Sequence, residues 1–202
     1  DPENLTPEQR NDPYRAARMG SFKSFSDGSL GSRSAKLYTD YADDPGNTGI
    51  LVISPEDLAK RMYKAYRHGL QPATHCIGDK ALEITLDAVE YCLEQGLKDG
   101  MTPEEQAKRL PFRIIHAQMA TPELIERMKK LPIVLDIQPT FLMTDLHWIE
   151  ERVGKERAVL SYPWKTYLDA GLIMAGGSDA PVESFNPWIG IYATVTRQDM
   201  DG

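Results

Sequence analysis

The chain of 202 residues has few cysteines, no long apolar segment and no excess of basic charge. Cys76 and Cys92 are too few for a disulfide framework and are typical of a reducing compartment. No uninterrupted apolar run approaches the roughly 20 residues of a membrane-spanning helix. The formal net charge of -7 does not favour binding to phosphate-rich surfaces. We therefore expect a cytoplasmic protein that binds neither nucleic acid nor membranes.

The start of the chain predicts a segment of a longer protein. The sequence begins with Asp1, not with methionine, and has no signal-peptide pattern. Residues 1–18 are polar and contain proline, which indicates an incomplete helix or a lead-in segment. We expect residues 1–202 to form a single partial domain cut from a longer protein.

Strand and helix patterns alternate along the rest of the chain. Short apolar runs predict strands, and cap residues followed by proline and acids predict helix starts. Strands are predicted over residues 21–26, 71–76, 112–115, 133–137 and 172–175, and helices over residues 55–68, 79–95, 122–130 and 162–170, with a short insertion helix opening at 102–105. Regular alternation is typical of the α/β class with a parallel sheet, because parallel strands need crossover connections.

Four polar side chains lie in or just after predicted strands: Lys23, His75, His116 and Asp179. In an α/β barrel the carboxyl ends of the strands form the rim of the active site, so such residues converge in space. Histidine and carboxylate are ligands that suit zinc and similar divalent ions. A carboxylate beside an activated water also serves as a general base. The pattern is therefore compatible with a metal site at the rim.

Each of these residues also has a structural interpretation. A strand-end histidine such as His75 or His116 is often only a hydrogen-bonded structural residue. Asp179, within a Gly-Gly-Ser-Asp-Ala-Pro run, fits a turn or a helix cap. Lys23 fits a surface side chain whose stem lies along the sheet. Spacing alone leaves the metal site and these structural roles as open alternatives.

A family resemblance narrows this choice. Five strings carry it, in this order: Lys23-x-x-x-Asp27-Gly28-Ser29-Leu30-Gly31-Ser32-Arg33, Thr74-His75-Cys76-Ile77-Gly78-Asp79-Lys80-Ala81, Ile115-His116-Ala117-Gln118, Gln138-Pro139 and Gly177-Ser178-Asp179-Ala180-Pro181-Val182. Together they resemble the amidohydrolase superfamily, in the family-three branch that includes N-substituted formamide deformylases. The resemblance covers the chain from about Met19 to Arg197.

The resemblance implies strands four to eight of a (β/α)8 TIM barrel. It implies that Lys23, carbamylated, bridges divalent metal ions, one or two per full-length chain and expected to be zinc. His75 and His116 correspond to the ligands on strands five and six, and Asp179 to the ligand and general base on strand eight. Asp27 and Arg33 fall in a family loop near the pocket and are expected to contact the substrate.

The sequence also departs from the family pattern. The family's first-strand ligands are a His-x-His pair, and this chain contains none; its other histidines are His68 and His147. The first three strands and the small β-sandwich domain are also absent. We therefore expect the chain alone to be inactive and to self-associate.

The expected activity of the intact protein is hydrolysis of a non-peptide carbon–nitrogen bond in a small amide, formamide or cyclic amide. Two alternatives remain open. One is a non-catalytic half-barrel that binds a small ligand or another copy of itself. The other is an aldolase-like enzyme in which Lys23 forms a Schiff base.

Overall fold

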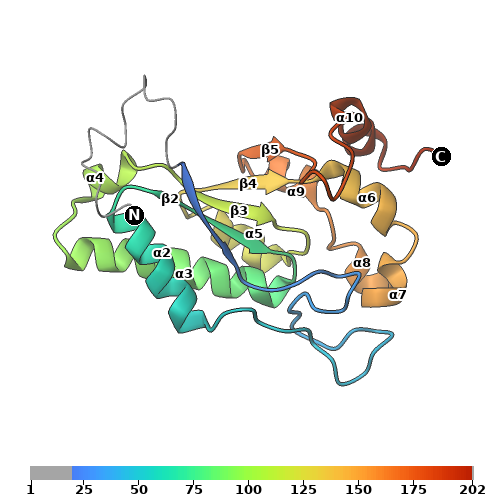
Figure 1. Ribbon diagram of the computed structural model, residues 1–202, viewed down its shortest axis with the longest axis horizontal. Coiled ribbons are helices and arrows are strands. Elements are labelled where there is room, and N and C mark those ends of the chain that lie inside the picture. Colours follow the sequence, from blue (N-terminus) through green and yellow to red (C-terminus); the bar gives the residue numbers. More distant parts are fainter. Residues whose placement is uncertain (1–19, 202) are drawn as a thin grey trace.

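The computed structural model describes residues 20–201, so the segment predicted over residues 1–18 lies outside the described residues. A sheet of five parallel strands runs through the molecule, in the spatial order of the sequence (Figure 1). The strands are β1 (Ser21–Phe25), β2 (Gln71–Cys76), β3 (Phe112–His116), β4 (Ile133–Ile137) and β5 (Met174–Gly176). The strand order and direction confirm the predicted α/β class, and an ordered all-parallel sheet is compatible with part of a barrel.

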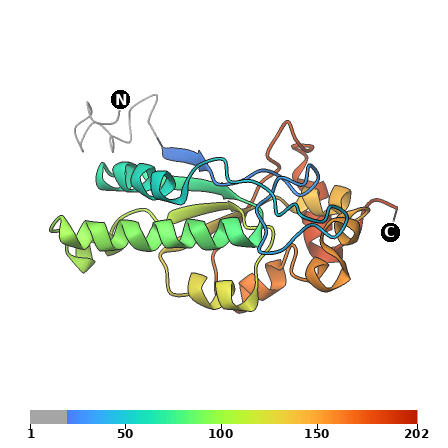
Figure 2. The ribbon, with the colours of Figure 1, turned by 90° about the horizontal axis from the view of Figure 1, so that it is seen from below.

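Helices follow the strands as crossover connections. They are α2 (Pro55–Arg67), α3 (Asp79–Lys98), α4 (Pro103–Ala107), α5 (Pro122–Met128), α6 (Pro139–Asp145), α7 (Ile149–Val153), α8 (Lys155–Ala158), α9 (Trp164–Asp169) and α10 (Pro187–Thr196). Figure 2 shows α2, α3 and α5 side by side along one face of the sheet. None of the helices within residues 20–201 is both long enough and apolar enough to span a membrane.

The main core lies between the sheet and these helices. Met62 and Tyr66 of α2 and Leu82 and Leu86 of α3 belong to it, together with Ile114 of β3. Ser54 caps α2 by accepting the backbone N–H of Asp57, and the apolar side chains of Leu58, Met62, Ala65 and Tyr66 on one face of α2 are buried. Burial of this apolar face fixes each helix against its strands and so fixes where the strands end.

The opposite face of the sheet follows from the strand register. Phe25, His75, Ile115 and Asp136 are successive partners across the four strands β1 to β4, so their side chains lie on the same side. Phe25 is half exposed, which shows that this face is not covered by another layer. His75 therefore lies on the uncovered face of the sheet, near its carboxyl edge.

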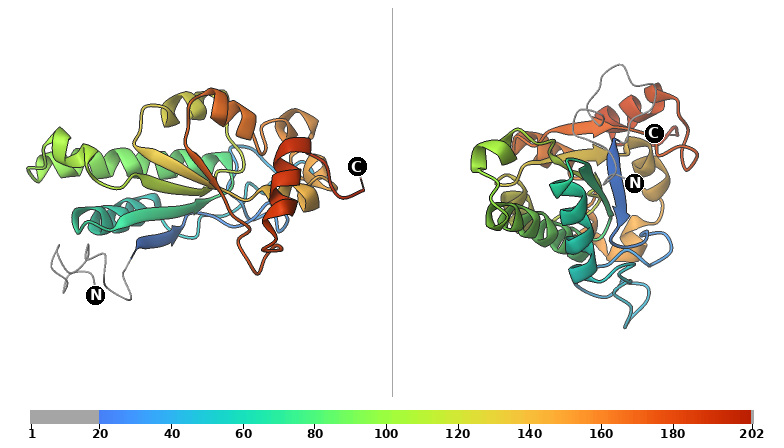
Figure 3. Two further views of the ribbon diagram at one scale, coloured as in Figure 1. Left: turned by 90° about the horizontal axis from the view of Figure 1, so that it is seen from above. Right: turned by 60° about the vertical axis from the view of Figure 1, so that its left-hand side comes forward.

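The second half of the chain differs from the sequence prediction in several places. The predicted long loop before residue 162 contains α6, α7 and α8, and α9 begins at Trp164. The strand predicted from Leu172 begins at Met174, and α10 was not predicted. Figure 3 shows α10 at the carboxyl end of the sheet beside α6. These helices make up the wall of the rim beyond β4.

Candidate metal centre

His75 and His116 meet at the carboxyl ends of β2 and β3. Their ring centroids are 4.5 Å apart, in an edge-on arrangement. Simple strand alternation would put His116 on the helix side with Ile114, because their positions differ by two. His116 and Ala117 instead adopt left-handed backbone angles, with φ of 74° and 43°. This departure from strand geometry is how the two imidazoles come together.

Hydrogen bonds hold this unusual backbone in place. The backbone N–H of Ala117 donates to the carbonyl of Cys76 at 3.1 Å. The Ala117 carbonyl accepts the hydroxyl of the fully buried Tyr167 at 2.7 Å. Non-glycine residues in the left-handed region cost free energy, on the order of 1 kcal/mol or more each, so they persist only where surrounding contacts fix them.

Burial keeps both imidazoles neutral. It is the largest cause that lowers the pKa of His116 to about 3, with further contributions from His75 and Lys23 that outweigh the nearby Gln138 amide. Burial is also the main cause that lowers the pKa of His75. The Nδ1 atom of His116 is buried and makes no hydrogen bond to any described residue. A neutral imidazole with an unused nitrogen is the form that binds a metal ion.

Lys23 and Asp179 lie near the two histidines without closing a site. Both side chains are exposed, and the Lys23 ammonium is 4.9 Å from the centre of the Phe25 ring. Their charges reach His75: Lys23 lowers its pKa and Asp179 raises it, both less than burial does. Within residues 20–201 no group of three His, Cys, Asp or Glu side chains is arranged to hold a metal ion.

The donor set is therefore compatible with part of a metal site. Two neutral imidazoles, one of them with an unpartnered buried nitrogen, and one carboxylate are ligands that zinc accepts. An unmodified lysine has donors only, so Lys23 contributes to such a site only as a carbamate. Further ligands are needed for a two-metal centre, and the sequence has no His-x-His pair to supply them.

The Asp27 carboxylate is enclosed next to His75. It accepts the backbone N–H groups of Lys36 at 2.9 Å, Ile77 at 3.1 Å and Gly78 at 2.9 Å. Burial raises its pKa to about 7, although these amides act in the opposite direction. Only 1% of Asp27 is exposed. A direct contact with substrate, as expected from the sequence, would require Asp27 to exchange these partners.

Arg33 is also engaged within the protein. Its guanidinium donates to both oxygens of Asp43, at 3.0 and 2.7 Å, and the Arg152 guanidinium contacts the same carboxylate. The Asp43 hydrogen bonds raise the pKa of Arg33. The structure thus gives Arg33 a role in fastening the loop to α7, and the expected substrate contact remains a prediction.

Sequence reasoning missed a buried polar network behind His116. Gln118 donates to Asp145 at 2.8 Å, and the Tyr162 hydroxyl contacts both side chains. All three residues are buried, and they join the end of β3 to α6 and to the segment before α9. Only Gln118 fell within a quoted family string, because Asp145 lies in a region where no helix or strand was predicted and Tyr162 was predicted only as the start of a helix.

The sequence also did not predict two buried polar side chains at this edge that lack a hydrogen-bond partner. The Gln138 Oε1 and Thr140 Oγ1 atoms are buried without a hydrogen-bond partner among the described residues. Both follow the end of β4 and stand at the start of α6. The Gln138-Pro139 string was a signal for the position, but burial of these atoms is visible only in three dimensions.

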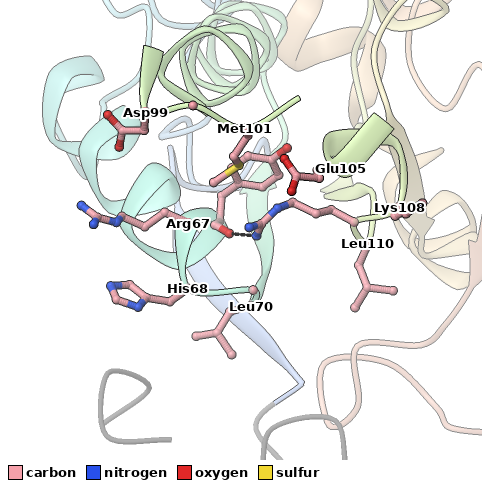
Figure 4. A pocket seen from close by; sticks show the side chains of 12 residues that line it. Arg67, His68, Leu70, Asp99, Met101, Glu105, Lys108 and Leu110 are labelled. Carbon is pink, nitrogen blue, oxygen red and sulfur yellow. Dashed lines mark hydrogen bonds between the residues drawn. The ribbon is translucent and has the colours of Figure 1, made fainter. Parts of the chain in front are cut away.

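A cavity of about 670 Å³ lies at the other end of the strands. Leu70 and Leu110, which precede β2 and β3, contribute to its wall, with Arg67, Asp99 and Lys108 around its mouth (Figure 4). The length of β2, roughly 20 Å at about 3.3 Å per residue, separates this cavity from His75. In α/β barrels the amino-terminal end of the strands contributes to stability, and chemistry takes place at the carboxyl end. We therefore place the candidate site at the histidines.

Comparisons with known proteins agree with this geometry. The whole chain, residues 1–202, matches the amidohydrolase family. The chain belongs to that family. It is 40% identical over 191 residues to the putative amidohydrolase YtcJ of Bacillus subtilis (strain 168), covering 95% of this chain and 34% of that protein. It is 26% identical over 158 residues to N-substituted formamide deformylase of Arthrobacter pascens, covering 77% and 27%.

A solved structure supports the fold assignment. A metal-dependent hydrolase of Pyrococcus horikoshii OT3 superposes with a TM-score of 0.78 at 36% identity, covering 91% of this chain and 35% of that one. The family match confirms the predicted superfamily and branch, and the superposition confirms the predicted fold class. The chain spans about a third of the length of the relatives it matches.

The buried network predicts a measurable pH dependence of stability. Burial raises the pKa of Asp145 from 3.8 to about 6, so the folded chain holds this proton more tightly than the unfolded chain does. Stability is therefore lost as pH rises between about 4 and 6, by about 2–3 kcal/mol from this group. Asp145→Asn, which cannot ionise, escapes this loss.

The measurement is urea unfolding of both metal-free proteins at pH 4, 5, 6 and 7. The difference in unfolding free energy should shift in favour of the variant across this range. Because the titration of Asp27 is common to both proteins, it cancels in the difference. Parallel profiles would contradict the buried ionisable network.

Proposed function

We propose that the protein carrying this chain is a metal-dependent hydrolase of non-peptide carbon–nitrogen bonds in small amides, formamides or cyclic amides. The observation that carries the proposal is the pair of neutral histidines at the carboxyl edge of a parallel sheet, with an unpartnered nitrogen on His116. Two relatives support it by their names, one as a metal-dependent hydrolase and one as a formamide deformylase. The protein acts as a cytoplasmic enzyme on small molecules.

The proposed site assigns a task to each residue. His75, His116 and Asp179 hold one or two divalent ions, expected to be zinc, and carbamylated Lys23 bridges them. Bound divalent ions supply activation of water and polarisation of the substrate carbonyl. Asp179 accepts the proton from the attacking water and delivers it to the leaving nitrogen as the carbon–nitrogen bond breaks. Asp27 and Arg33 fix the loop beside the pocket. Their effect on substrate binding is through the shape of that loop.

One structural observation favours a second candidate, a binding half-barrel without catalysis. The described residues do not close a metal site. The helices cover only one face of the sheet, so a ligand could bind on the other face, where Phe25 is half exposed. Metal analysis separates the two candidates, because a binding scaffold needs no ion. The Schiff-base alternative for Lys23 predicts activity that survives chelators and trapping of a substrate adduct by borohydride.

Metal content should depend on the two histidines. In the intact protein, elemental analysis should find one or two divalent ions per chain, and a chelator should abolish hydrolysis. His75→Ala and His116→Ala should each lower the bound metal, because each removes a ligand. His68→Ala, on the turn after α2 and far from the site, is the matched control and should keep full occupancy. Full occupancy in the His75→Ala, His116→Ala double variant would refute the site.

The proton-transfer role of Asp179 has its own test. Asp179→Asn in the intact protein should retain most of the metal and lower kcat by about 10²-fold or more, because general-base catalysis typically contributes that much. Steady-state kinetics and metal analysis on the same preparation make the comparison. Near-normal turnover would show that another group accepts the proton, and Asp179 would then be a ligand only.

The chain of 202 residues should self-associate and bind metal weakly. The strands β1 and β5 leave two sheet edges among the described residues, and unpaired strand edges seek partners. Trp188 and Val195 of α10 and Phe185 just before it add exposed apolar area. Size-exclusion chromatography with light scattering should show dimers or larger assemblies. A monodisperse monomer with two tightly bound ions would contradict this expectation.

A further inference from the structure

The ring of His75 makes one well-defined hydrogen bond. Its Nε2 atom lies 3.0 Å from the backbone carbonyl oxygen of Gly28. A carbonyl oxygen has no proton to donate, so Nε2 must carry the hydrogen. In the neutral ring, a proton on Nε2 leaves Nδ1 as the nitrogen with a free electron pair.

Asp27 holds the Gly28 carbonyl in this position. The Asp27 carboxylate is anchored by the amides of Lys36 and of Ile77 and Gly78, the two residues after β2. The next residue in the chain is Gly28, whose carbonyl therefore cannot move away from β2 unless those bonds break. Asp27 Oδ1 also lies 3.5 Å from His75 Nε2, so a second oxygen besides the Gly28 carbonyl is close to that nitrogen.

Close packing against Ser34 also restricts the backbone of Gly28. A Cβ atom on Gly28 would lie 2.1 Å from the Ser34 hydroxyl oxygen, and the Gly28 N–H donates to the Ser34 carbonyl at 3.2 Å. The residue without a side chain is what allows the loop to fold back this tightly. Asp27 and Gly28 thus act together on the histidine.

We propose that Asp27 is a positioning residue for His75: through the Gly28 carbonyl it fixes the tautomer with the proton on Nε2 and presents Nδ1 to a metal ion. This assignment rests on the proposed function for the metal, whereas the tautomer itself does not. Side chains and carbonyls that orient a ligating histidine commonly change metal affinity by about 10–100-fold when they are altered. Asp27 is therefore assigned to the orientation of the His75 ring.

Nuclear magnetic resonance of the histidine rings tests the tautomer without metal. In the intact protein, with nitrogen-15 only in histidine, the His75 signals are assigned by their loss in His75→Gln. Two-bond correlations at neutral pH should show the Nε2–H form in the unaltered protein. Asp27→Asn, whose amide group cannot accept all three backbone N–H groups, should populate the Nδ1–H form. Gly28→Ala is a second, independent lesion with the same expected result.

A zinc titration with a competing chelator completes the experiment. Asp27→Asn should weaken zinc binding by about 10–100-fold. The matched control is Asp79→Asn, because the Asp79 carboxylate is also buried and accepts the amides of Tyr38 and Lys80 in the same loop region. Neither of these hydrogen bonds involves His75. The Asp79→Asn protein should therefore lose stability but keep the His75 tautomer and the zinc affinity.

The outcomes separate the two proposals. An unchanged tautomer and unchanged zinc affinity in Asp27→Asn overturn the positioning role. Equal changes in Asp79→Asn also overturn it, because they would reflect general loosening of the loop. If the tautomer responds only to Asp27 and Gly28 and zinc binds in none of the proteins, the positioning of the ring is supported and the proposed metal function fails.

Discussion

The buried carboxylate of Asp27 is the constraint on which the site side of the molecule depends. Removing an ionised carboxylate from water costs several kcal/mol unless hydrogen bonds replace its hydration. Here three backbone amides replace it, two of them at the turn between β2 and α3. The long connection after β1, which has no helix or strand of its own, is thereby fixed to the end of the strand that carries His75.

Asp79 repeats this device one turn further along. It accepts the Tyr38 amide from the same connection, and Gly78 between the two contacts allows the backbones to touch. A Cβ on Gly78 would lie 2.0 Å from the Lys36 carbonyl oxygen, so no other residue fits without moving the loop. The Gly78-Asp79 string is therefore explained by packing of a loop on a turn. Its closeness to His75, the proposed metal ligand, is a consequence of where that turn lies.

The sequence was sufficient for the fold up to β4, and it supplied the residues of the candidate site as a prediction. Strong caps such as Ser54, and short apolar runs such as residues 112–115, depend on local interactions that are visible in one dimension. The helices α6 to α8 were missed because they are only four to seven residues long, and short helices are stabilised by tertiary packing rather than by propensity. The start of α10 is visible in the sequence, since Asn186 is a favourable N-cap residue and Pro187 a favourable first helical residue.

The geometry of the site lies beyond sequence reasoning for a different reason. Alternation predicts that His116 points toward the helices, and only the left-handed backbone at His116 and Ala117 brings its ring to His75. That backbone depends on Tyr167, some fifty residues later, whose hydroxyl binds the Ala117 carbonyl. The burial of Asp27 is likewise set by residues far apart in the chain. The family resemblance could name Asp27 and His116. Their contacts depend on residues far apart in the chain, which no local sequence pattern encodes.

The two faces of the sheet differ in the side chains that they carry. Arg113 and Asp136 form a bidentate ion pair there, at 2.7 Å for both bonds, in the rows next to His75. An ion pair on this face keeps it polar, whereas the helix side of the same strands is filled by apolar groups such as Phe112 and Leu135. Phe25 is half exposed on this face, but several of the most exposed apolar side chains, Phe185, Trp188 and Val195 among them, lie in or next to α10. The proposed site and the exposed apolar surface thus lie in different parts of the chain, so a change at Asp27 and a change at α10 should have separate effects.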